Sequence, residues 1–303
     1  MRRLLFIYVS LLVTLIVAGC SEFDMNSTDP NNDWQVGMES PMPIEFDLYP
    51  TTRGVINGKD QMSGKDFGVF ALNCSEDDFN ESIYLNNVKA TCSEQSGDIR
   101  FGLSDVYYYP LDSDKLNFYS YHPYSGQTHK VSEDGSKVLV SLNLGADDIL
   151  YSKADEGYNV ETVLNYGKPG FSFQHVTSGL KFAAEKTSEA SDFTVQKLTF
   201  HNAPVVVDLC IVDNNGNDEG TLTWQKRTRT LNVEFDKVIF VMPNFDYQCY
   251  VTINDVAYGP IAVNPGAVSE GLDAHKPGYI YKYKFIIDKD INGYPTIMLA
   301  KDN

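Results

Sequence analysis

A cysteine near the start of the chain, Cys20, is placed for covalent attachment of lipid. Two arginines and an apolar run from Leu4 to Ala18 precede it, which is typical of a secretory signal peptide. The segment Val17-Ala18-Gly19-Cys20 has the pattern of a lipobox, in which the thiol takes lipid such as palmitate. A membrane-spanning helix needs roughly 20 apolar residues, and this run has 15. We therefore predict a lipoprotein signal peptide over residues 1–19.

A second place for chemistry is the peptide bond between Arg53 and Gly54. Before it, the apolar side chains of Ile44, Phe46 and Leu48 alternate with acidic ones, as in a strand with one buried face. The basic segment that follows is of the kind that trypsin-like proteases cut. Cleavage would remove this strand and leave a groove edged by unpaired backbone groups, which a strand from another molecule could fill. Alternatively, residues 44–49 are the first strand of a monomer, and the residues alone favour that interpretation.

Acidic side chains near the C-terminus are spaced like calcium ligands. Asp288, Asp290 and Asn292 match the first positions of an EF-hand loop, but Leu299 stands where a bidentate glutamate is needed. Asn292-Gly293 between two strand-like runs is instead a strong hairpin-turn signal. We predict a hairpin turn here, and another in the acidic segment 213–220, and no metal site.

Motifs of known enzymes are missing from the sequence. The chain has no HExxH pair, nucleophile elbow, P-loop or dinucleotide-binding glycine motif. Its acidic residues lie mainly in turn-like segments, so no pair of glycosidase carboxylates can be nominated. The sequence contains five scattered histidines: His122, His129, His175, His201 and His275. We predict a protein that is not an enzyme and needs no cofactor.

Four cysteines remain after lipidation of Cys20: Cys74, Cys92, Cys210 and Cys249. An even number in an exported protein permits two disulfides, with three possible connectivities. Cys210 and Cys249 lie within apolar strand patterns, where a free thiol behaves as a small hydrophobic group. The sequence leaves the pairing open.

The charge of the chain excludes nucleic acid as a partner. The net charge is −17, and loss of Arg2 and Arg3 with the signal peptide makes it −19. No basic cluster is evident that would neutralise phosphates. An anionic membrane surface would also repel this chain, so lipid must provide the anchor. Residues 20–43 are rich in Ser, Asn, Asp and Pro and are predicted to form a flexible tether.

The rest of the chain has the texture of an all-β protein. Short apolar or alternating runs, rich in aromatic and β-branched residues, recur between turn signals, for example at 67–72, 115–122, 137–143, 204–212 and 279–288. No long window has helical periodicity. The length suggests two domains, which we place at residues 44–168 and 169–303. Clusters among the 19 tyrosines are interpreted as sheet packing in preference to sugar binding.

Several motifs in their order resemble the fimbrillin family of Bacteroidota, the type V pilins. Besides the lipobox, the alternating strand and Arg53-Gly54, they are FGVFA from Phe67, YLNNV from Tyr84, LNFYSYHPY from Leu116, DILYSKA from Asp148, FQHVTSGLKFAAE from Phe173 and PGYIYKYKFII from Pro277. The resemblance covers essentially the whole chain. It implies two tandem transthyretin-like, Greek-key β-sandwich domains, export as an outer-membrane lipoprotein, cleavage after Arg53, and polymerisation with other pilin subunits by strand exchange.

By the same resemblance, residues with specific roles can be assigned. Cys20 is the lipidation site, Arg53-Gly54 the scissile bond, and Ile44, Phe46 and Leu48 the plug strand. The donor strand would come from the C-terminal part of a neighbouring subunit. Its candidate side chains are Tyr279, Tyr281, Tyr283, Phe285 and Ile287.

Three classes of function are therefore compared. The first is a structural pilus subunit that supports adhesion, with the variants of a fimbrial anchor or a tip adhesin for a host glycan or protein receptor. The second is a surface lipoprotein that binds glycans and does not polymerise. The third, an enzyme, has no motif in its favour.

Overall fold

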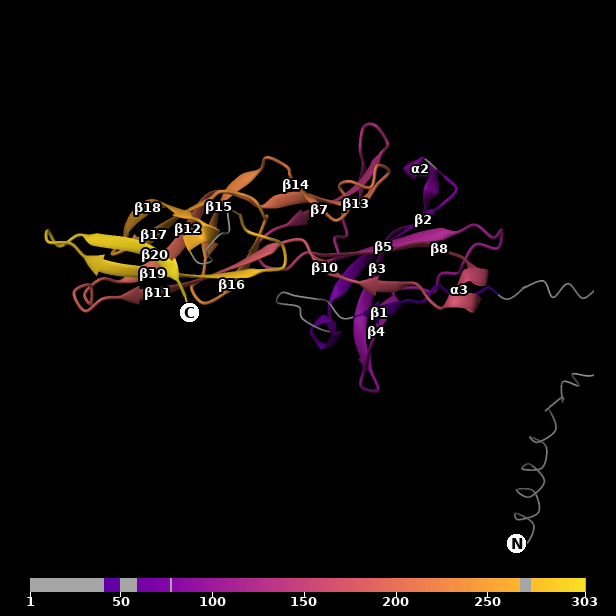
Figure 1. Cartoon of the computed structure of the whole chain (residues 1–303), viewed down its shortest axis with the longest axis horizontal. Coiled ribbons are helices and arrows are strands. Elements are labelled where there is room, and N and C mark those ends of the chain that lie inside the picture. Colours follow the sequence, from indigo (N-terminus) through magenta and orange to yellow (C-terminus); the bar gives the residue numbers. More distant parts are fainter. Residues whose placement is uncertain (1–40, 50–58, 77, 268–273, 303) are drawn as a thin grey trace, which may run out of the picture. The chain divides into compact units, whose positions relative to one another are not determined.

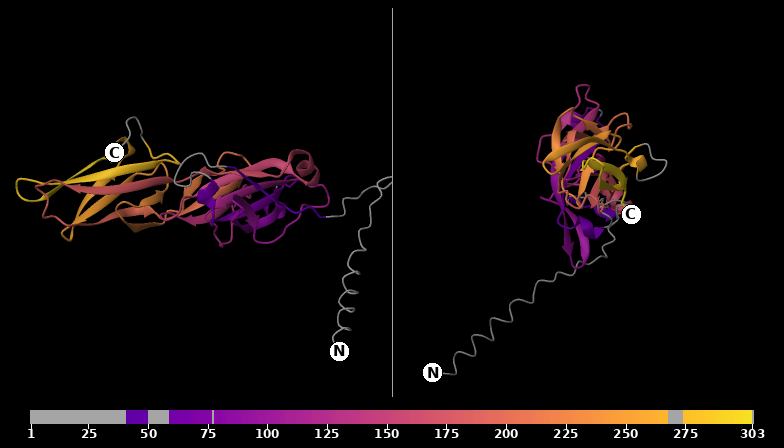
Figure 2. Two further views of the ribbon diagram at one scale, coloured as in Figure 1. Left: turned by 90° about the horizontal axis from the view of Figure 1, so that it is seen from below. Right: turned by 90° about the vertical axis from the view of Figure 1, so that its left-hand side faces the viewer.

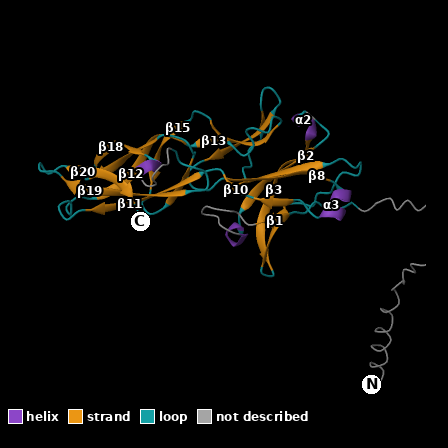
Figure 3. Ribbon diagram, viewed as in Figure 1, coloured by secondary structure: helices purple, strands orange, loops and turns teal. Residues whose placement is uncertain are grey.

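Strands make up most of the regular structure. The computed structural model describes residues 41–49, 59–76, 78–267 and 274–302. In this part of the chain the helices are short: α2 (Phe79–Ser82), α3 (Val160–Tyr166), and the 3₁₀ turns η1 (Lys59–Met62) and η2 (Pro265–Ala267) (Figure 3). Within the described ranges no helix has the length and apolar character needed to cross a membrane. The predicted all-β fold is confirmed.

The first group of sheets is built on a six-stranded antiparallel sheet. Its spatial order is β10-β8-β5-β2-β3-β4. The strands are β2 (Asp66–Asn73), β3 (Ile83–Gln95), β4 (Asp98–Leu103), β5 (Leu116–His122), β8 (Leu150–Tyr158) and β10 (Gln174–His175). The central strand β5 has apolar or aromatic side chains on both faces, so it is buried on both sides. Each face of this sheet therefore needs its own cover.

One face is covered by a four-stranded sheet in the order β14-β13-β7-β6. Its strands are β6 (Lys130–Val131), β7 (Lys137–Asn143), β13 (Val206–Asp213) and β14 (Leu222–Trp224). Aromatic side chains of the larger sheet, including Phe70, Tyr119 and Tyr121, pack there against Val140 and Leu209. The other face is covered by residues 42–49 and by β9 (Gly170–Ser172), and that arrangement forms the candidate site described below.

A second pair of sheets encloses a separate core. One has the order β16-β11-β19-β20, and the other has the order β15-β12-β17-β18 (Figure 1). The first contains β11 (Ser178–Lys186), β16 (Val238–Val241), β19 (Ile280–Lys289) and β20 (Pro295–Lys301). The second contains β12 (Val195–Pro204), β15 (Thr228–Val233), β17 (Tyr247–Ile253) and β18 (Val256–Val263). In the left view of Figure 2 the yellow C-terminal strands run along the length of this pair of sheets, and β19 pairs in parallel with β11.

The chain passes between the two groups of sheets more than once. β9 and β10, which follow residue 168, pair with β1 (Asp47–Tyr49) and β8. After β12 the chain returns, and β13 pairs with β7 over seven residue pairs. The predicted division at residues 168 and 169 thus falls inside the first group of sheets, which also takes in residues 206–224. Sequence composition does not report such long-range pairing.

A buried polar network lies where the chain enters the second group of sheets. Nδ1 of His175 donates to one carboxylate oxygen of Asp148 at 2.6 Å, and Thr177 Oγ1 donates to the other at 2.7 Å. The hydroxyl of Thr177 also accepts from the backbone N–H of Ile149 at 3.1 Å. Both side chains of the His175–Asp148 pair are almost fully buried. The network fixes the end of β10 to the start of β8.

We predict that Asp148→Ala lowers the free energy of unfolding by about 3 kcal/mol, because it leaves buried partners without an acceptor. Urea denaturation measures the loss. The neighbouring Asp147 is exposed, so Asp147→Ala is the matched control and should change stability by less than about 0.5 kcal/mol. Equal effects of the two substitutions would contradict the structural role of the network.

A histidine is also buried beside β19. His275 Nε2 lies 2.8 Å from the hydroxyl of Tyr283, and its ring packs edge-on against Tyr281. Desolvation lowers the pKa of His275 from 6.5 to about 4. The unfolded chain therefore binds a proton at this residue at a higher pH than the folded chain does.

It follows that stability is lost as the pH falls from about 6.5 to about 4, where the unfolded state takes up the additional proton. In denaturation series at several pH values, His275→Gln should flatten this slope. The exposed His201 provides the control, His201→Gln, which should keep the wild-type slope. A slope that is the same for wild type and His275→Gln would show that another group is responsible.

Candidate functional site

The residues predicted to be lipidated or cleaved are not among those that the structure describes. Cys20, Arg53 and Gly54 lie outside the described residues. The predicted plug strand, in contrast, is described as far as Tyr49. The site is therefore built from this strand and from the surfaces that it contacts.

Backbone hydrogen bonds hold the strand at its two ends. Near its start, Ile44 N donates to the carbonyl of Tyr107 at 2.8 Å, and Tyr109 N donates to the carbonyl of Met42 at 3.0 Å. Near its end, β1 runs parallel to β9, with Leu48 opposite Phe171. The strand thus fills a gap between the segment around residue 108 and β9.

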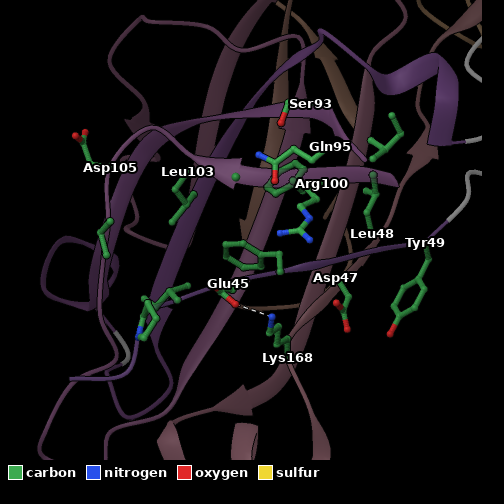
Figure 4. A pocket seen from close by; sticks show the side chains of 17 residues that line it. Glu45, Asp47, Leu48, Tyr49, Ser93, Gln95, Arg100, Leu103, Asp105 and Lys168 are labelled. Atoms are coloured by element: carbon green, nitrogen blue, oxygen red, sulfur yellow. Dashed lines mark ion pairs between the residues drawn. The ribbon is translucent and has the colours of Figure 1, made fainter. Parts of the chain in front are cut away.

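The alternation seen in the sequence is reproduced in the burial of the side chains. Ile44, Phe46 and Leu48 are 5%, 8% and 5% exposed. The acidic side chains between them point outward, and Glu45 forms an ion pair with Lys168 at 2.5 Å (Figure 4). A strand of period two with one buried face accounts for this pattern.

Phe46 is at the centre of the first core. Its ring stacks on Phe171 at a centroid distance of 4.8 Å, and it meets Phe118 edge-on at 5.1 Å and Phe101 edge-on at 5.8 Å. These partners come from β9, β5 and β4 respectively, so one side chain joins three strands. Burial of each such large apolar side chain contributes about 1.5–3 kcal/mol. Without the strand, the aromatic floor beneath it would be open to water.

A glycine lets the end of the strand close on β9. The ring of Tyr49 lies over Gly170, and a Cβ at position 170 would come within 2.2 Å of Tyr49 Cε2. Tyr49 itself remains half exposed. Only glycine at this position lets β1 and β9 approach with the tyrosine between them.

A pocket of about 590 Å³ runs between the strand and β4. β4 pairs with β3 on one edge, and its other edge has no partner strand in the described part of the chain. Figure 4 shows Ser93, Gln95 and Arg100 lining this space, beside the ion pair of Glu45 and Lys168. The strand therefore has a hydrogen-bonded neighbour in β9, and an open groove along β4.

The predicted donor strand lies inside its own sheet. β19 pairs with β11 over eight residue pairs on one edge and with β20 over seven on the other. Tyr281, Tyr283, Phe285 and Ile287 are buried in the second core, whereas Tyr279 precedes the strand and is 43% exposed. One edge of this sheet is β20, which pairs with β19 alone among the described strands and has a half-exposed face; the other edge is β16.

The side chains of two calcium candidates, Asp288 and Asp290, accept hydrogen bonds within the protein, in or next to the hairpin of β19 and β20. Asp290 Oδ1 accepts from the backbone N–H groups of Asn292 and Tyr294 at 2.9 and 2.7 Å, within the tight hairpin of β19 and β20. Asp288 accepts from the hydroxyl of Thr187 at 2.5 Å. In the described ranges no cluster of three acidic, His or Cys side chains has the arrangement of a metal site.

The acidic loop between β13 and β14 has the same character. The carboxylate of Asp213 is buried and accepts from the backbone N–H groups of Asn215, Asn217 and Asp218 at 3.0–3.2 Å. These hydrogen bonds lower the pKa of Asp213 below its ordinary value. The side chain organises its own loop.

The four cysteines whose disulfide pairing the sequence left open, Cys74, Cys92, Cys210 and Cys249, are all free thiols. Cys74 is exposed, whereas Cys92, Cys210 and Cys249 are buried. Burial raises the pKa of each of the three buried thiols to about 12, so they are inert at neutral pH.

Tyr119 and Tyr121, from one of the tyrosine clusters, are buried in the core between the first two sheets.

The sequence predicts the strand at residues 44–48, but it does not predict the aromatic side chains against which this strand packs. Phe101, Tyr109, Phe118 and Phe171 are distributed over 70 residues of sequence, and only the sheet brings them together. The alternation of Phe171 and Phe173 was the one local signal that this segment is half buried.

We predict that Phe46→Ala lowers the free energy of unfolding by about 3–5 kcal/mol, because it leaves a cavity lined by three aromatic rings. The control is Asp47→Ala, at the adjacent exposed position, with an expected change below about 0.5 kcal/mol. Chemical denaturation compares the two variants. A loss below 1 kcal/mol for Phe46→Ala would contradict the description of this strand as part of the core.

Comparison with known proteins was made for sequence and for structure. Residues 52–298 match the family model described as fimbrillin-like. A fimbrium subunit, Fim1C of Phocaeicola vulgatus, is 24% identical over 147 residues, which span 46% of this chain and 36% of that protein. The match thus covers about a third of the curated relative.

A solved structure shares the fold. A candidate cell adhesion protein from Bacteroides uniformis superposes with a TM-score of 0.54 at 16% identity, over 86% of this chain and 98% of that one. The fimbrial anchor protein Mfa2 from Porphyromonas gingivalis gives a TM-score of 0.45 at 5% identity, over 87% and 100% of the two chains. At such identities the structural likeness to the B. uniformis protein shows the fold alone.

The family model covers most of the chain, and it agrees with the resemblance found in the sequence motifs. The chain belongs to the fimbrillin-like family.

Proposed function

We propose that this chain is a structural subunit of a surface fimbria, exported as a lipoprotein and polymerised by strand exchange after cleavage at Arg53. Membership of the fimbrillin-like family supports the coarser part of this proposal, that the chain is a fimbrial protein of the cell surface. The observation that carries the finer proposal is the strand at residues 42–49. It completes the first core, and its last described residue lies four positions before Arg53.

Maturation on this account has two steps. Lipid on Cys20 first brings the subunit to the outer membrane, with residues 20–43 as a tether. Cleavage after Arg53 then separates residues 20–53, which include the plug strand, from the rest of the chain. The strand so released is held by side-chain burial and by a few backbone hydrogen bonds at its ends, so an incoming strand can replace it.

The vacated groove defines what the incoming strand must offer. Its floor of aromatic side chains accepts large apolar groups at every second position, as Ile44, Phe46 and Leu48 now supply. The edges of β4 and β9 supply unpaired backbone groups for a new ladder. A contact of this head-to-tail kind does not close on itself and therefore builds a filament.

The C-terminal strands of a second copy are the proposed donors. The alternation of Tyr279, Tyr281, Tyr283, Phe285 and Ile287 fits the groove, but β19 must first leave both β11 and β20. β20 pairs only with β19 in the described structure, so its release breaks one ladder and leaves the second core largely in place. Ile297 and Leu299 on β20 alternate in the same way. Donation therefore begins with β20 and extends to β19 as far as the second core allows.

An uncleaved subunit would act differently. It would keep its lipid and its own strand, and it would serve as an anchor at the base of a fimbria. The state of the Arg53–Gly54 bond distinguishes the two roles.

Limited trypsin treatment of the full chain tests the proposal. We expect a cut after Arg53, a new N-terminus at Gly54, and SDS-resistant ladders on gels as strands exchange. The Arg53→Gln variant should resist this cut and stay monomeric under the same conditions. A cleaved product that remains monomeric would overturn polymerisation by strand exchange.

A further inference from the structure

A pocket of about 400 Å³, separate from the strand groove, is lined by amide, hydroxyl and basic groups. It lies over the ends of β7 and β13, next to the turn that leads from β14 to β15. Its principal polar lining residues are Gln127, Lys130, Asn143, Gln225, Arg227 and Arg229. No carboxylate is among the residues that line it.

The local fold presents the two arginines on one side of this pocket. β14 ends at Trp224, the chain turns through Lys226 with a φ of +56°, and β15 begins at Thr228. Trp224 Nε1 donates to the carbonyl of Arg227 at 3.3 Å, which holds the turn. Arg229 pairs with Ala203 in the ladder of β15 and β12.

Three of the lining residues, Lys130, Ser141 and Gln225, are hydrogen-bonded to Asp208, which does not itself line the pocket. One carboxylate oxygen of Asp208 accepts from Ser141 Oγ at 2.7 Å, from Lys130 Nζ at 3.2 Å, and from Gln225 Nε2. Gln225 Nε2 also donates to Ser141 Oγ at 2.9 Å. Asp208 thus balances the charge of Lys130, and it leaves the charges of Arg227 and Arg229 uncompensated.

The lack of partners for the arginines is unusual in so acidic a chain. The net charge is −17, and every ion pair between described residues uses a lysine or a histidine. The described arginines are Arg100, Arg227 and Arg229, and none of them is paired with a carboxylate of another described residue. Two of the three face the same pocket.

We propose that this pocket binds an acidic saccharide, with Arg227 and Arg229 holding its carboxylate or sulfate. A guanidinium presents a planar fork of donors that matches such an anion. The amides of Gln127 and Asn143 are suited to sugar hydroxyls. The acidic surface elsewhere on the chain disfavours a long polyanion such as nucleic acid. This site does not depend on strand exchange, so the two proposals fail independently.

Titration calorimetry of the full chain in detergent tests the site. The probes are a hyaluronate hexasaccharide, which carries carboxylates, and a chondroitin sulfate hexasaccharide, which also carries sulfates; maltohexaose is the neutral comparison. We expect binding of one or both acidic probes and none of maltohexaose. The double variant Arg227→Gln/Arg229→Gln should bind at least about tenfold more weakly, because two charge-assisted contacts are lost.

A charge-matched control separates the site from the overall field of the protein. Lys197→Gln/Lys237→Gln removes two exposed positive charges outside the pocket and should leave affinity within about twofold, because exposed charges at a distance are screened by salt. Circular dichroism verifies that both double variants are folded. Equal losses in the two variants, or no binding of either acidic probe, would overturn the proposal. Displacement of the saccharide by inorganic sulfate at the same concentration would also overturn it, as would tighter binding of a poly-glutamate peptide.

Discussion

The packing of one N-terminal strand into an aromatic core is the interaction on which the rest of the first group of sheets depends. The six-stranded sheet is apolar on both faces, and only one face is covered by another extended sheet. The opposite face is covered by residues 42–49 together with β9, and Phe46 joins three strands there. A strand that completes a core through its side chains can be replaced by a strand of another chain, because side-chain burial does not require covalent continuity.

The backbone imposes the matching constraint. A strand that is added at a groove must satisfy donors and acceptors as well as fill space. β9 supplies one edge and already pairs with β1, whereas the free edge of β4 borders the open pocket. In the second group of sheets β20 is one of the edge strands. On the proposed account, strand exchange joins an edge that one subunit can release to a groove that another has opened.

Local patterns in the sequence predicted those strands and turns that depend on residues close together in the chain. The alternation at Ile44, Phe46 and Leu48 reported a half-buried strand, and Asn292-Gly293 reported the hairpin of β19 and β20. The pairing of β13 with β7 could not be predicted. The sequence pattern of β13 indicates a strand, but it does not indicate which other strand is its neighbour. The free state of the thiols likewise required three-dimensional positions. The basic pocket could not be predicted from the sequence, because Lys130 and Arg229 are far apart in the chain and the net charge is strongly negative.

Mass spectrometry of the N-terminus of the surface-exposed protein, taken from intact cells, tests the central claim most directly. If the subunit is polymerised by strand exchange, assembled material begins at free Gly54 and lacks residues 20–53. If every surface copy instead begins at a lipid-modified Cys20, the strand at residues 42–49 stays in its own core, and the account of this chain as a polymerising subunit is contradicted.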